Sequence, residues 1–247
     1  MNKQFIIGFS FCTILIFSFT VNSQTNTKNP YSNSWFMFMS QITTQKKWAS
    51  TIELHERTGK FLNDHGQILI RPSLDYIFNS NISASLGYTF IHNDPYTYSN
   101  FSLPINENNC WEQLLFKFKI SNLILQNRIR LEHRWIEKVS LINDEKVIEG
   151  YQFKNRFRFR FDVQHKLFQI RSKDVFCHGF NEIWLGLDNE FKLPNLSRNW
   201  VYIGLGLKID ENSNLQFGYM RQLDLVDLNT YQTDIIQLTY IHNFNLK

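Results

Sequence analysis

Residues 123–135 read LILQNRIRLEHRW, and along this stretch apolar and polar side chains alternate with the period of a β-strand. The odd-numbered positions are mostly apolar: Leu123, Leu125, Ile129, Leu131 and Trp135, with Asn127 and His133 between them. The even-numbered positions carry the charges: Arg128, Arg130, Glu132 and Arg134. A helix would spread these charges around its whole circumference, whereas a strand places successive side chains on opposite faces. The stretch is therefore predicted to be a two-faced β-strand.

The same alternation recurs along most of the chain. Residues 151–163 place Phe157, Phe159 and Phe161 on one face and Arg156, Arg158 and Arg160 on the other. The predicted strands are 35–41, 48–57, 67–78, 83–91, 111–120, 123–135, 151–163, 176–188, 199–209, 214–222 and 233–245. Many of these are long enough for a tilted membrane-crossing strand of about 9–11 residues. Pro72 is expected to weaken its strand or to mark a bulge, because proline has no N–H to donate.

The connections between these strands alternate between short and long. The short ones are 43–47, 79–82, 121–122 and 210–213, and the long ones are 58–66, 92–109, 136–150, 190–198 and 223–232. Short periplasmic turns and longer external loops are typical of outer-membrane barrels. The predicted fold is therefore all-β, an antiparallel transmembrane β-barrel of about 10–12 strands. With that orientation residues 24–33 either thread the lumen or form a further strand.

The N-terminus is predicted to be a signal peptide at residues 1–23. Lys3 precedes an uncharged run from Phe5 to Val21, and Ser23 ends a segment suited to cleavage before Gln24. The expected organisation is a signal peptide at 1–23, a polar segment at 24–33 and a barrel domain at 34–247. Cys110 and Cys177 could pair in an oxidising compartment, but they are expected to be unpaired.

Aromatic residues make up 16% of the chain and charged residues 19%. Many rings fall on the apolar faces, often near strand ends: Trp48, Tyr76, Phe78, Tyr88, Phe90, Trp135, Tyr151, Tyr240 and Phe244. Such rings predict the aromatic girdles of a membrane barrel, with the aromatic excess facing lipid. A secreted β-sandwich, such as an adhesin, would alternate in the same way and is a further alternative. The separation of basic and aromatic groups onto opposite faces argues against nucleic-acid binding.

Several motifs together resemble a known family. They are LPINE at 103–107, WEQL at 111–114, the Arg128–Trp135 and Arg156–Arg160 alternations, NEI at 181–183, Tyr202-x-Gly204-x-Gly206 and Phe217-Gly218-Tyr219. In this order they look like the bacterial DUF2490 family, and the resemblance covers nearly all of the chain after residue 23. It implies a signal peptide and an outer-membrane β-barrel, but no particular activity.

The candidate site is a polar cluster facing the lumen. Its members are Arg128, Arg130, Glu132, Arg134, Arg156, Arg158, Arg160 and Glu182. Crowded guanidinium groups in low-dielectric surroundings need carboxylates or bound anions, and Glu132 and Glu182 are the natural partners. The cluster is either a structural salt-bridge plug or an anion-binding, porin-like path for small solutes.

Catalysis has little support in the sequence. There is no G-x-S-x-G motif, and His133 and His242 fall on apolar faces. No catalytic residue, metal site or other cofactor is expected. The predicted protein is therefore a monomeric component of the bacterial outer membrane with a structural or passage role. Its expected partners are lipid, lipopolysaccharide and the barrel-assembly machinery, with no nucleic acid; the alternative function is an outer-membrane enzyme acting on lipid or lipopolysaccharide.

Overall fold

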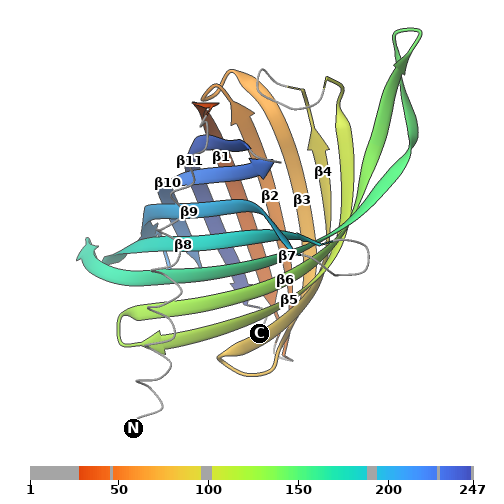
Figure 1. The fold of residues 1–247 in the computed structure, drawn as a ribbon. Helices are drawn as coiled ribbons and strands as arrows, with labels where there is room; N and C mark the ends of the chain where they lie inside the picture. The colour runs from red at the N-terminus through yellow and green to blue at the C-terminus, as the bar shows by residue number, and fades with distance from the viewer. Residues whose placement is uncertain (1–27, 45–46, 96–101, 188–193, 227–228, 246–247) are drawn as a thin grey trace.

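The computed structural model describes residues 28–44, 47–95, 102–187, 194–226 and 229–245. Within these residues eleven strands form a closed barrel (Figure 1). The strands are β1 (Lys28–Thr43), β2 (Trp48–Gly59), β3 (Asp64–Ile77), β4 (Ile82–Asn93), β5 (Ile105–Ile120), β6 (Leu123–Ile142), β7 (Glu145–Ile170), β8 (Lys173–Leu187), β9 (Asn195–Lys208), β10 (Ser213–Val226) and β11 (Asn229–Asn245). An observed strand overlaps every predicted one, so the all-β barrel is confirmed.

The barrel closes between its first and last strands, which run parallel. Each strand pairs antiparallel with its sequence neighbour, and β1 pairs parallel with β11, as in Trp35 opposite Gln237. The prediction of an entirely antiparallel barrel is therefore wrong at this pair. The reason is geometric: in an odd number of alternating strands the first and the last point the same way. β1 begins at Lys28, inside the segment 24–33 for which the sequence left threading or a further strand open.

The strands β6 and β7 continue well beyond their neighbours. Their hairpin turns between Ile142 and Glu145, and it projects from one end of the barrel (Figure 1). Residues 136–150, predicted to be a loop, are therefore mostly paired strand. Asn143 and Asp144 both have positive φ, at 50° and 63°, as a two-residue hairpin turn requires.

Pro72 interrupts the ladder between β3 and β4 without a bulge. Ile70 pairs with Phe90 and Ser73 with Gly87, whereas Arg71 and Pro72 have no pairing partner in β4. The register is the same on both sides of the gap, because only the hydrogen bonds are lost at proline.

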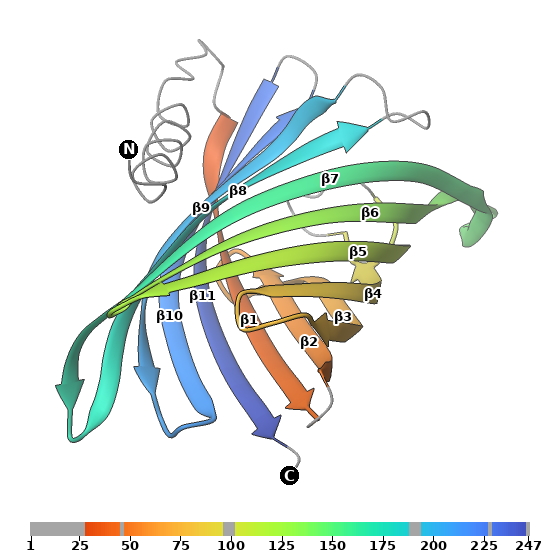
Figure 2. The ribbon, with the colours of Figure 1, turned by 90° about the horizontal axis from the view of Figure 1, so that it is seen from below.

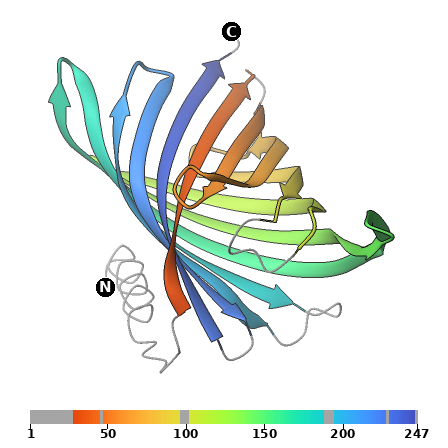
Figure 3. The ribbon, with the colours of Figure 1, turned by 90° about the horizontal axis from the view of Figure 1, so that it is seen from above.

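Apolar side chains cover the outside of the barrel. Leu86, Ile203 and Phe217 are among the most exposed of them, at 68%, 67% and 58%. The part of the chain that the structure describes holds no helix long and apolar enough to cross a membrane. Two walls of the barrel lie opposite each other in the views of Figure 2 and Figure 3. One wall consists of β5, β6, β7 and β8, and the other consists of β11, β1, β2 and β3.

Not all of the rings face outward. A buried cluster inside the barrel comprises Trp35, Phe180, Trp184, Trp200, Tyr202, Met220 and Ile235. The expectation that the aromatic excess lies on the outer face is therefore wrong for these buried rings. β8 carries apolar residues on both faces, so the alternation of this strand could not show that Phe180 and Trp184 point inward.

Candidate functional site

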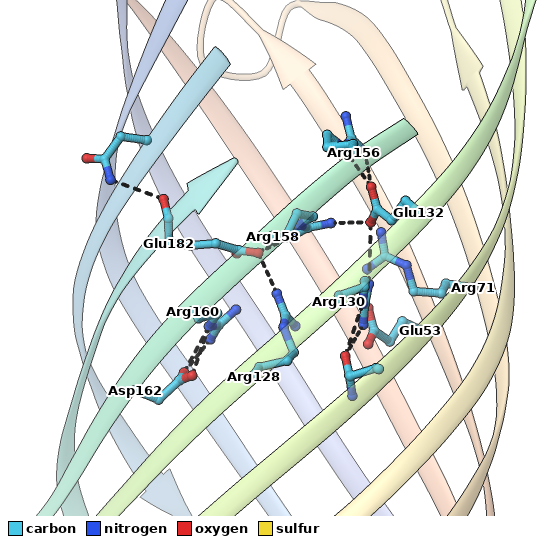
Figure 4. Close-up of polar contacts among 12 residues, drawn as sticks. Glu53, Arg71, Arg128, Arg130, Glu132, Arg156, Arg158, Arg160, Asp162 and Glu182 are labelled. Atoms are coloured by element: carbon cyan, nitrogen blue, oxygen red, sulfur yellow. Dashed lines mark hydrogen bonds and ion pairs between the residues drawn. The ribbon is translucent and has the colours of Figure 1, made fainter. Parts of the chain in front are cut away.

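Two enclosed carboxylates lie at the centre of the lumen. Glu182 is 0% exposed and Glu132 is 1% exposed. Glu132 accepts hydrogen bonds from Arg158 at 2.7 Å and from Arg156 at 2.6 Å. Glu182 accepts from Arg128 and from Arg158, both at 2.7 Å (Figure 4). Arg158 therefore bridges the two carboxylates.

Strand register brings these groups together. Arg130 lies opposite Arg158, and Arg128 lies opposite Arg160, across the β6–β7 ladder. Arginines that lie directly opposite each other repel, so these cross-strand pairs are stable only when nearby carboxylates compensate their charge. On the other side of β7, Arg160 is paired with Glu182 of β8, which places that carboxylate beside the row of arginines.

Further ion pairs surround this centre in one-to-one combinations. Arg134 donates two hydrogen bonds of 2.7 Å to Glu107, and Arg71 donates at 2.7 Å to Glu53. Two more pairs join Arg160 to Asp162 and Arg198 to Asp224. Such bidentate and charge-assisted bonds hold guanidinium groups in a fixed geometry.

The structure places all eight predicted cluster residues on the inner face, in three groups. Six are joined in the network around Glu132 and Glu182, whereas Arg134 pairs with Glu107 and Arg160 pairs with Asp162. Arg71, Glu107 and Asp162 belong to the site and were missed. Asp162 continues the alternation of Arg156–Arg160, and Arg71 alternates with apolar neighbours. The alternation along each strand therefore indicates that both side chains point into the lumen.

Aromatic rings stack on the guanidinium groups. Arg130 lies 3.9 Å from the Trp111 ring centre, Arg158 lies 4.0 Å from that of Trp184, and Arg160 lies 3.6 Å from that of Phe180. Cation–π contacts of this kind are stronger when water is excluded. The rings and the ion pairs together fill the middle of the lumen.

Gly87 makes room for one of these rings. A Cβ atom at this position would lie 2.1 Å from the Trp111 ring. Gly87→Val is therefore expected to destabilise the barrel by about 1–3 kcal/mol through overpacking, measured by thermal unfolding in detergent. Gly186→Ala is the matched control, because its Cβ would meet only Asn195 O at 3.8 Å. Equal stability of the two variants would show that the ring can move aside.

A separate polar group lies on the outer face of β5–β7. His133 Nδ1 lies 2.8 Å from Asn155 Oδ1, and His133 Nε2 lies 3.4 Å from Glu112 Oε2. Cys110 is directly opposite His133 in the β5–β6 ladder. Cys110 and Cys177 are both free thiols. The sequence showed His133 on an apolar face but could not show which residues the register places beside it.

A second outward contact joins Ser213 to His242, at 2.7 Å between the hydroxyl and Nδ1. Among the described residues, no group of three or more His, Cys, Asp or Glu side chains is placed to hold a metal ion. The central cluster itself consists of arginine, carboxylate and indole groups.

Comparison with known proteins identifies the family to which this chain belongs. No curated protein and no solved structure matches the chain significantly. The model of the family described as "Protein of unknown function (DUF2490)" matches residues 32–231, which include most of the barrel and the whole central cluster. The chain therefore belongs to the DUF2490 family.

Proposed function

We propose that this protein is a bacterial outer-membrane β-barrel whose lumen is closed, so that it serves as a structural, non-conducting element of the membrane. The observation that carries the proposal is the approach of side chains from separate strands to one aromatic ring inside the barrel. Arg57 of β2 and Arg158 of β7 both lie over the Trp200 ring of β9, at 5.9 Å and 5.6 Å. An open passage would need these groups to be apart.

The outer surface supports the membrane location. Soluble monomers rarely expose contiguous apolar patches larger than a few hundred Å². Here every strand except β8 carries exposed large apolar side chains, among them Phe38, Leu86, Leu114, Ile203 and Leu238. A bilayer would cover this surface, and the signal peptide predicted at residues 1–23 would direct export.

Two measurements test the proposal. The full chain is expected to fractionate with outer membranes and to migrate faster on detergent gels before heating than after it. In planar bilayers the same protein is expected to give no steady conductance. A protein that is soluble without detergent and shows no gel shift would contradict the membrane barrel, and regular conductance steps would contradict the closed lumen.

A second candidate function is an enzyme acting on lipid, and the outward polar group favours it. A histidine held by an asparagine is a geometry that suits a general base. Beside it lies an outward groove of about 620 Å³, lined in part by Pro72, Leu86 and Tyr88, and Tyr88 is directly opposite Cys110. The groove could take an acyl chain while its ester faces Cys110 and His133.

The two functions are separated by a hydrolysis assay. Purified protein in mixed micelles of phospholipid is expected, on the second candidate, to release fatty acid at a rate that His133→Gln abolishes. Ser80→Ala, in the exposed connection between β3 and β4, is the control. If the unaltered protein releases no fatty acid, or if His133→Gln releases it at the same rate, the enzyme function at His133 is excluded.

A further inference from the structure

One arginine of the lumen has no carboxylate partner among the described residues. Arg57 Nη1 donates a 2.5 Å hydrogen bond to Gln67, and its guanidinium lies 3.9 Å from the Trp35 ring centre. Its Nε atom is buried and has no hydrogen-bond partner in the part of the chain that the structure describes. A neutral amide and a ring face do not cancel a full positive charge in low-dielectric surroundings.

The charges around Arg57 add to this excess. The four charged groups that act on it most strongly are all arginines: Arg71, Arg198, Arg158 and Arg156. At the centre of the lumen only Glu132 and Glu182 serve four arginines, which are Arg128, Arg130, Arg156 and Arg158.

Neither of two further buried acids corrects this imbalance, and one of them, Glu137, is paired with Lys146. Asp75 accepts hydrogen bonds from Thr51 and Gln41, which are neutral, and it lies near the end of β3 that leads to the short turn before β4. Arg57 is at the opposite end of the barrel wall, two residues before β2 ends at Gly59. Asp75 therefore does not neutralise Arg57, whose end of the lumen also holds the ion pairs Arg198–Asp224 and Arg156–Glu132.

The end of the lumen that holds Arg57 also contains an unused neutral donor. Trp184 is only 4% exposed, and its indole N–H has no hydrogen-bond partner. Arg156 and Arg198 lie 4.3 Å and 4.8 Å from its ring centre. Trp184 also packs on Trp200 at 4.4 Å, which in turn packs on Trp35 at 5.3 Å. This chain of rings brings Arg57, Arg156 and Arg198 to one region.

We propose that this region is a binding site for an oxyanion, formed by Arg57 with Arg156 and Arg198 beside Trp184. Planar guanidinium forks match the oxygen geometry of phosphate and carboxylate, and an anion there would neutralise Arg57. Arg57 and Arg198 are partly exposed, whereas Arg130 and Glu182 are enclosed. The site is therefore open to a soluble anion from the end of the barrel where β2 ends and β9 begins.

The inference goes beyond the closed-barrel function, and the lumen would bind the anion whether or not the barrel is in a membrane. Thermal unfolding of the full chain in non-ionic detergent tests it, with inorganic phosphate replacing chloride at constant ionic strength. The unaltered protein is expected to gain about 2–4 °C in Tm, with saturation. Arg57→Met is expected to show no phosphate response and, without phosphate, to melt no lower than the unaltered protein.

Arg221→Met is the matched control, because Arg221 is on the outer face, where it contacts Asp234. This variant is expected to keep the phosphate response. Phosphatidylglycerol is added in a separate arm to distinguish a lipid phosphate from a soluble one. No response in the unaltered protein, a response kept by Arg57→Met, or a response to the lipid alone would overturn the proposal. None of these results bears on the gel shift or the bilayer conductance.

Discussion

Glu182→Gln is expected to lower the free energy of unfolding of the barrel by about 3–5 kcal/mol. The carboxylate is fully enclosed and accepts hydrogen bonds from Arg128 and Arg158. Its removal leaves Glu132 as the only acid for the central arginines, so buried positive charge becomes uncompensated. The measurement is the unfolding midpoint in urea, followed by circular dichroism on detergent-solubilised protein.

Two further variants show whether charge is the cause. Glu149→Gln changes an exposed carboxylate in the projecting hairpin and is expected to alter stability by less than about 0.5 kcal/mol. Adding Arg128→Met to Glu182→Gln removes one uncompensated guanidinium and is expected to restore part of the loss. A Glu182→Gln barrel as stable as the unaltered protein would mean that water in the lumen solvates these arginines well enough to replace the carboxylate.

Trp184→Ala is expected to convert the closed lumen into a conducting one. The Trp184 ring contacts Trp200 and lies against Arg156, Arg158 and Arg198, so it fills the space between β7, β8 and β9. Its loss leaves a cavity lined by guanidinium groups, which is polar enough to hold water. The measurement is single-channel recording in planar bilayers, where we expect conductance steps with a preference for anions.

The same variant is expected to lose about 3–5 kcal/mol of stability, as large-to-small core substitutions do. Its gel shift therefore has to be recorded alongside, to show that the conducting protein is folded. Trp135→Ala is the control, because the Trp135 ring faces outward on β6 and is 38% exposed. A folded Trp184→Ala protein that leaves the bilayer sealed would show that the ion pairs alone close the lumen.

The alternation along each strand was sufficient to place the arginines of β6 and β7. A strand has only two faces, so once Leu131 and Phe157 are assigned outward, Arg130 and Arg158 must point inward. The same rule explains why His133 was placed outward although its partners were not found. Glu112 and Asn155 become its neighbours only through the pairing of β5 with β6 and of β6 with β7.

The aromatic lining shows where alternation fails. In β8 both faces are apolar, with Phe180 and Trp184 alternating with Ile183 and Leu185, so no face is marked as the outer one. Only the pairing of Arg160 with Glu182 and of Glu182 with Trp200 shows which face meets the lumen. The projecting hairpin was likewise missed, because its charged and apolar residues are exposed on both sides.

The sequence by itself determined that this protein consists of two-faced strands with arginine on one face, because side-chain direction within a strand depends only on position along the chain. The tertiary structure alone decided how the barrel closes, which acids meet which arginines and which arginine is left without one. Those contacts depend on register between strands and on reach across the lumen, from β2 to β9 in the case of Arg57 and Trp200. The net charge inside the lumen depends on the side chains of all the strands together, so it cannot be predicted from any single strand.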